Sequence, residues 1–223
     1  MQLSGKVQLC GIVGSDPVLR RFGMGIGLTC CTNNHTLTNQ LIAPTEGESM
    51  SELIEIDSSG NEQYIWLQER TQSCGPACVY MVERIRQQAC PAGGEERIRE
   101  ICRLLPQGYT EKAGTASYTA LALALRRIGI SGSATYIANF RQFSADCSFP
   151  FITRIGWPNG GGHFVVCVGR STLGQLICLD PWFGLSEPRM DQLPAYCVTR
   201  DARRAMCLAI PIGGIFSGHS ILL

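Results

Sequence analysis

Residues 66–80 contain the side chains best suited to covalent chemistry in this sequence, with Cys74 at their centre. Ser73 is a favourable N-cap, Gly75 and Pro76 suit a tight first turn, and apolar residues then recur at helical spacing. The pattern predicts that Cys74 lies at the N-terminus of a helix, where unpaired N–H groups and the helix dipole favour a nucleophilic thiolate. Packing is the commoner use of a cysteine at a helix start, so the rest of the chain must supply the other groups that such chemistry needs.

A thiolate nucleophile needs a general base, and His163 is the strongest candidate among the three histidines. It opens the apolar run 164–168, which is typical of a buried strand, whereas His35 lies in a polar stretch and His219 near the C-terminus. A second apolar run ends at Asp180, and the short turn between the two runs predicts an antiparallel hairpin. His163 and Asp180 could then lie side by side, with the carboxylate orienting the imidazole.

Other side chains near these residues could assist the same chemistry. Gln68 precedes Cys74 by six positions, and its amide could donate a hydrogen bond to the oxyanion that forms when a thiolate attacks a carbonyl group. Trp182 and Phe183 come shortly after the second strand, where aromatic rings either line a substrate pocket or seal the core. Cys78 lies one helical turn after Cys74, and packing is its expected role.

The sequence resembles the papain-like cysteine peptidases of the bacteriocin-processing (double-glycine leader) family and its stand-alone relatives. The resemblance covers about residues 62–185 and is carried by Gln68 and Cys74 in Gln-x5-Cys-Gly-Pro-Ala, by Gly-His163-Phe-Val-Val and by Leu-Asp180-Pro. It implies that Cys74 is the nucleophile and His163 the general base and acid. Asp180 would orient the imidazole, and Gln68 would stabilise the oxyanion. The fold that the resemblance implies is α+β and papain-like, with a helical part packed on an antiparallel sheet.

The function that this resemblance implies is cleavage of a peptide or protein substrate without a cofactor. The transporter-linked members of the family carry membrane spans and an ATP-binding domain, and this sequence shows neither. A stand-alone processing peptidase, or an effector or toxin delivered into another cell, would fit that pattern. Two other functions stay open: a transglutaminase-like or deamidating acyl transfer at the same thiolate, and a catalytically silent binding module.

Composition limits the kinds of partner and site that we expect. A chain of 223 residues with 45% hydrophobic content can bury a sizeable core as one domain with extensions. The formal net charge of +1 gives no electrostatic reason to expect a nucleic acid or a membrane surface as partner. Twelve cysteines without a regular framework or a CxxC pair predict mostly reduced thiols and argue against a zinc site. The sequence does not predict an oligomeric state.

The chain divides by pattern into an N-terminal extension at 1–60, a peptidase domain at 61–215 and a tail at 216–223. The extension is rich in Gly, Thr and Asn and lacks a clear signal peptide, so it reads as a delivery signal, a pro-segment, a partner-binding arm or a segment without a role. We expect a cytoplasmic protein or one that is secreted or delivered into a target cell. Glycines and a proline make the uncharged C-terminal stretch a poor membrane span, so no stable membrane insertion is expected. Gly213-Gly214 resembles the double-glycine sites that the resembled family cleaves, which is only a thin basis for proposing self-processing.

Hydrophobic periodicity also predicts the elements that would position these residues. The predicted helices span 74–88, 95–105 and a Thr115-capped segment that stops at Gly129, with a loop at 107–114. The predicted strands are 53–56, 64–67, 134–137, 149–157, 164–168, 175–180 and 205–212.

Overall fold

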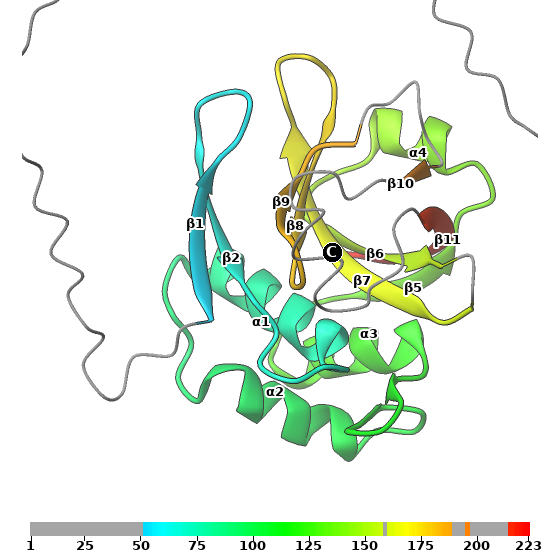
Figure 1. Ribbon diagram of the computed structural model, residues 1–223. Coiled ribbons are helices and arrows are strands. Elements are labelled where there is room, and N and C mark those ends of the chain that lie inside the picture. Colours follow the sequence, from blue (N-terminus) through cyan, green and yellow to red (C-terminus); the bar gives the residue numbers. More distant parts are fainter. Residues whose placement is uncertain (1–50, 158–159, 189–194, 197–213) are drawn as a thin grey trace, which may run out of the picture. The chain divides into compact units, whose positions relative to one another are not determined.

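The computed structural model describes residues 51–157, 160–188, 195–196 and 214–223, which all belong to the unit formed by residues 46–223. In this unit, helices α1, α2 and α3 lie together on one side of an antiparallel sheet (Figure 1). The described helices are α1 (Cys74–Gln87), α2 (Gly94–Arg103), α3 (Tyr118–Arg127) and α4 (Phe140–Asp146). The described strands are β1 (Glu52–Ile56), β2 (Glu62–Trp66), β3 (Tyr109–Thr110), β4 (Gly114–Thr115), β5 (Ser133–Tyr136), β6 (Phe151–Gly156), β7 (Gly162–Arg170), β8 (Leu176–Asp180), β9 (Gly184–Ser186), β10 (Ala195–Tyr196) and β11 (Gly214–Leu222). The predicted α+β fold class is confirmed.

The sheet of seven described strands has the order β10-β11-β6-β7-β8-β9, and β5 also pairs with β11. Every pair in this sheet is antiparallel. The predicted hairpin of β7 and β8 is confirmed: Cys167 lies opposite Cys178, and the turn closes with a 2.9 Å hydrogen bond from Gly174 N–H to Ser171 O. This pairing brings the strand that begins beside His163 next to the strand that ends at Asp180.

Helix α1 forms the centre of the core between the helices and the sheet. All ten residues from 74 to 83 are buried, because this helix packs against α2, α3 and β7 at once. Ala77, Cys78 and Met81 belong to the same hydrophobic cluster as Val166 on β7. The apolar sequence after Cys74 therefore fixes the first turn of α1 against the strand that carries His163.

Several predicted elements differ from the structure. The loop predicted at 107–114 includes the short hairpin of β3 and β4, and the N-cap of α3 is Ser117 rather than Thr115, since the Ser117 hydroxyl accepts the Thr119 N–H at 3.1 Å. Helix α4 was not predicted. The strand predicted at 205–212 lies outside the described residues.

The expected boundaries at both ends of the domain also need correction. Residues 216–222 are not a tail but part of β11, which pairs with β5 on one side and β6 on the other. At the other end, β1 lies inside the expected extension 1–60 and forms an antiparallel hairpin with β2. Both segments are needed to complete sheets whose other strands lie in the predicted domain.

No helix in the described part of the chain is long and apolar enough to cross a membrane. Gly213 lies outside the described residues, whereas Gly214 is buried as the first residue of β11. A Cβ atom at Gly214 would lie 2.5 Å from Ile155 Cγ2 and 2.7 Å from Trp157 Cζ3. A buried glycine that pairs within a sheet is a poor peptidase substrate, so this position does not favour self-processing.

The Gly214→Ala substitution should lower the free energy of unfolding by about 1–3 kcal/mol, because the added methyl group overlaps two side chains that are themselves packed. Thermal and urea unfolding followed by circular dichroism would measure the change. Gly156→Ala on the neighbouring strand β6 is the matched control, since the nearest atoms to its Cβ would be 3.9 Å away. Equal stability of the two variants would contradict the close packing at Gly214.

Candidate active site

Cys74 is the first residue of α1 and is only 8% exposed. Ser73 occupies the N-cap position as predicted, but its side chain does not cap the helix. Its hydroxyl instead donates to Arg70 O at 3.0 Å and accepts the Arg70 N–H at 3.1 Å. The expected capping bond is therefore wrong, and no N-cap side chain competes for the N–H groups in the first turn beside Cys74.

Close packing explains why a glycine follows Cys74. A Cβ atom at Gly75 would lie 2.7 Å from Thr115 Oγ1 and 3.0 Å from Leu121 Cδ2. Gly114 is in the left-handed region with φ of 70°, and its Cβ would lie 2.8 Å from a main-chain oxygen of the loop before α1. The start of α1 can approach β4 and α3 this closely only because both glycines lack a side chain.

His163 and Asp180 form a fully buried pair. His163 Nε2 lies 2.8 Å from Asp180 Oδ1, and both side chains are 0% exposed. The same oxygen accepts the main-chain N–H groups of Trp182 at 2.7 Å and Phe183 at 3.1 Å. The carboxylate thus fixes the orientation of the imidazole and directs the other ring nitrogen, Nδ1, away from Asp180. That nitrogen is buried and has no hydrogen-bond partner among the described residues.

The environment of His163 favours its protonated form. Burial opposes protonation, but the charge of Asp180, the hydrogen bond with Asp180 and the interaction with the Cys74 sulfur outweigh it, and the pKa of His163 rises to about 10. At neutral pH the ring is therefore an imidazolium whose charge lies beside Cys74. A cation in this position stabilises a thiolate, as does the N-terminal end of α1.

Aromatic rings surround the imidazole. The Trp182 ring stacks on His163 with a centroid distance of 4.3 Å and an angle of 14°, and Phe183 lies edge-on at 6.5 Å. Trp157 is nearly parallel to His163 at 5.9 Å. From the sequence, Trp182 and Phe183 were expected either to line a substrate pocket or to seal the core, and Trp157 was not singled out. Counting back across the antiparallel pairing of β6 with β7 would have placed Trp157 near His163, because Gly156 lies opposite Gly162.

Gln68 lies next to the end of β8, since its main-chain N–H donates to Pro181 O at 2.9 Å. Its side-chain Nε2 donates to Arg70 O at 2.6 Å and to Thr71 O at 2.8 Å. Both amide hydrogens are engaged, and Oε1 is buried without a partner among the described residues. The segment that carries Gln68 is thus close to Asp180, while the donor role expected for its amide requires that one of these two bonds be released.

Residues 62–192 match the family model described as "Peptidase C39 family". The chain belongs to this family. The predicted membership and the predicted class of enzyme, a cysteine peptidase, are both confirmed. A comparison with curated proteins found no match.

Solved structures of C39 peptidase domains are similar to this chain at low identity. One is a double glycine motif protease from an AMS/PCAT transporter in complex with the leader peptide, at 20% identity and a TM-score of 0.47, covering 71% of this chain and 88% of that one. Another is the peptidase domain of Streptococcus ComA, a bi-functional ABC transporter involved in a quorum sensing pathway, at 17% identity and a TM-score of 0.46, covering 70% of this chain and 93% of that one.

The second thiol of α1 in this C39 peptidase is a poor nucleophile. Cys78 is fully buried, and the pKa of its thiol is raised well above its ordinary value by burial first and then by the charges of Cys74, Asp180 and Glu95. Its role is packing in the core, as expected. Among the described residues, no group of three or more His, Cys, Asp or Glu side chains is arranged to hold a metal ion.

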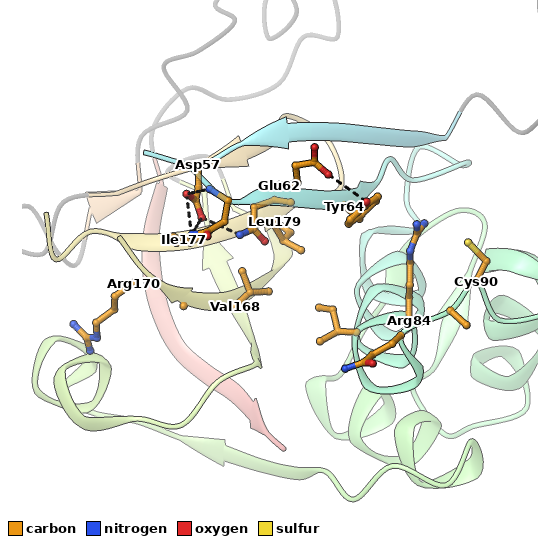
Figure 2. Close-up of a pocket in the computed structure, with 15 residues that line it drawn as sticks. Asp57, Glu62, Tyr64, Arg84, Cys90, Val168, Arg170, Ile177 and Leu179 are labelled. Carbon is orange, nitrogen blue, oxygen red and sulfur yellow. Dashed lines mark hydrogen bonds between the residues drawn. The ribbon is translucent and has the colours of Figure 1, made fainter. Parts of the chain in front are cut away.

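A cavity of about 750 Å³ lies at the opposite end of α1 from Cys74. Figure 2 shows Val168, Ile177 and Leu179 on its sheet side and Arg84 and Cys90 on its helix side. The cavity is lined by none of the residues that surround His163, so it is separate from the candidate active site.

The rate of iodoacetamide labelling of Cys74 against pH tests the coupling between the thiol and His163. In the wild type, labelling should already be fast at pH 6–7, because His163, with its pKa raised to about 10, is protonated there and its charge favours the thiolate. The Asp180→Asn variant removes the charge that raises this pKa, so burial should lower it and labelling of Cys74 should move to higher pH. Peptide mass mapping would measure the rate at each cysteine.

Cys78 provides the internal control in both proteins, since its buried thiol should label slowly throughout. Identical pH profiles for Cys74 in the wild type and in Asp180→Asn would show that the carboxylate does not act on the thiol through His163.

Proposed function

We propose that this C39 peptidase cleaves peptide bonds through Cys74, His163 and Asp180, and that it acts as a processing peptidase on a peptide or protein substrate. The observation that carries the proposal is the buried His163–Asp180 hydrogen bond of 2.8 Å, which leaves the unpartnered Nδ1 of the imidazole available to Cys74. Family membership supports peptide hydrolysis as the reaction, and the three residues supply its nucleophile, its acid and base, and the group that orients the base.

The reaction begins from a thiolate at Cys74 and an imidazolium at His163. The sulfur attacks the substrate carbonyl carbon, a C–S bond forms, and the carbonyl oxygen becomes an oxyanion. When the tetrahedral intermediate collapses, the C–N bond breaks and His163 gives its proton to the leaving amine. His163, now neutral, takes a proton from a water molecule whose oxygen attacks the acyl-enzyme. Collapse of the second intermediate releases the acid product and restores the thiolate and the imidazolium.

The first turn of α1 supports stabilisation of the oxyanion. The Ser73 side chain accepts no hydrogen bond from the N–H groups of this turn. The helix dipole adds a positive potential at the same end of the helix. Gln68 adds a further donor if its amide releases Arg70 O or Thr71 O when substrate binds. Trp182 and Phe183 exclude water from the His163–Asp180 pair, which strengthens the interaction that orients the ring.

Cys74→Ala should abolish turnover without unfolding the protein, whereas Cys78→Ala should retain most of it, because only Cys74 lies beside His163. Cleavage of a fluorogenic peptide library that includes Gly-Gly sequences would measure turnover, and addition of a primary amine would distinguish hydrolysis from acyl transfer to an amine. Full activity of Cys74→Ala would contradict the proposal. A loss of activity in Cys78→Ala that Cys74→Ala does not show would contradict it as well.

Gln68→Ala tests the oxyanion contribution of the amide. If Gln68 donates to the oxyanion, kcat should fall on the order of a hundredfold or more, while KM changes little. Gln68→Glu keeps the length of the side chain but removes the donor, so it should lose a similar factor. Unchanged kinetics in both variants would mean that the amide only holds the loop through Arg70 O and Thr71 O.

A further inference from the structure

Glu95 and Arg99 are the two buried charged residues of α2. Glu95 lies in the first turn of α2 and is 0% exposed, whereas its neighbour Glu96 has a half-exposed side chain. Burial raises the pKa of Glu95, and the interactions with the Ser73 side chain, the Glu69 main-chain N–H and Arg99 act in the opposite direction. A carboxylate is costly to bury unless it is well paired, so the groups that pair with Glu95 indicate what it does.

The partners of Glu95 lie on both sides of Gln68. Glu95 Oε2 accepts the Trp66 indole N–H at 3.2 Å and the Glu69 main-chain N–H at 3.0 Å. Ser73, which immediately precedes Cys74, helps to lower the pKa of this carboxylate, while its hydroxyl donates to Arg70 O. One buried side chain therefore binds the last residue of β2 and the middle of the loop between β2 and α1.

Arg99 supplies the charge opposite to Glu95 and forms a second ionic contact with the loop, through Glu69. It is 1% exposed, and its Nη1 lies 2.6 Å from Glu95 Oε1 and 2.9 Å from Glu69 Oε2. Glu69 is thus bound through its main chain by Glu95 and through its carboxylate by Arg99. Arg99 also binds Glu96, with 3.0 Å between Nε and Oε2.

The same loop is bound to the sheet on its other side. The Gln68 main-chain N–H donates to Pro181 O, directly after Asp180. The loop therefore joins α2, through Glu95, to the end of β8, through Pro181. Its position sets where Gln68 lies relative to the His163–Asp180 pair, whereas packing against α2, α3 and β7 holds the start of α1.

We propose that Glu95 is a positioning residue for peptide cleavage: its buried carboxylate fixes the loop 67–73 so that Gln68 is aligned with the substrate carbonyl. This inference rests on the proposed roles of Cys74 and His163. Stability alone is a poor explanation for the cluster, because a buried ion pair often contributes little compared with apolar packing. The concentration of its contacts on one loop favours alignment, and a small misplacement of catalytic groups costs large factors in rate.

Glu95→Gln provides the test, because it keeps the volume of the side chain but replaces an acceptor oxygen with an NH2 group. Two of the present partners, Trp66 Nε1 and the Glu69 N–H, are donors and cannot both bind an amide that must also serve Arg99. We expect kcat to fall about tenfold or more, with KM nearly unchanged. Iodoacetamide labelling of Cys74 at pH 7 should stay within about twofold of the wild type, since alkylation needs the thiolate but not the alignment of the loop.

Glu96→Gln is the matched control: it lies on the same helix and binds the same Arg99, yet it does not contact the loop in any described hydrogen bond. Its kcat should equal that of the wild type. Trp66→Phe is a second test that keeps an aromatic ring and removes only the indole N–H donor, and it should lower kcat about threefold even if Glu95→Gln fails to fold.

Cys74→Ala in the same assay separates the two proposals. If Cys74→Ala is inactive while Glu95→Gln and Trp66→Phe both match Glu96→Gln, the positioning role is wrong and the catalytic assignment stands. If kcat and Cys74 labelling fall together in proportion to the folded fraction, Glu95 is structural only, which also overturns the inference. Activity of Cys74→Ala would instead overturn the proposed function.

Discussion

The carboxylate of Asp180 is the constraint on which the geometry around His163 depends. A charge inside a protein core must be matched by donors, and Asp180 Oδ1 accepts three N–H groups. Two of them, from Trp182 and Phe183, come from the turn that directly follows β8, so local chain geometry provides them. The third comes from His163 across the β7–β8 pairing. Orientation of the imidazole is thus a consequence of satisfying one buried oxygen.

The residues that could be predicted from the sequence are those whose positions follow from local pattern. An apolar run, a four-residue turn and a second apolar run determine an antiparallel hairpin, so His163 and Asp180 could be placed on neighbouring strands. Helical spacing after Cys74 similarly predicted where α1 begins. In each case the relevant contacts lie within the element or between strands joined by a short turn.

The predictions that failed or stayed incomplete depend on the directions of side chains, which the spacing of residues in the sequence does not determine. Ser73 is at the N-cap position, but its hydroxyl turns back to Arg70, because the loop before α1 presents main-chain groups there. The Gln68 amide turns to the same part of the loop. Trp157 and Glu95 were not singled out, since each acquires its role from partners that are distant in sequence or lie on another element. A buried Glu in a charged helix looks like any surface Glu until its surroundings are known.

Helix α1 begins between two buried ionic groups of different origin. The His163–Asp180 pair lies on the sheet, and the Glu95–Arg99 pair lies on the neighbouring helix. The charges of both Asp180 and Glu95 help to raise the pKa of Cys78, one turn into α1. The low dielectric of the core leaves both pairs weakly screened, so their charges act on the thiols at the start of α1.

The family match ends at residue 192, but the sheet does not end there. Strand β11 lies between β5 and β6 and buries Ile221 and Phe216 in the core. A chain cut at the end of the matched segment would leave one edge of β6 open and remove apolar side chains that cover its neighbours. Open edges of this kind pair readily with other chains and promote aggregation. The segment that matches the family model is therefore shorter than the sheet that buries the core, and a recombinant version of this domain should include β11.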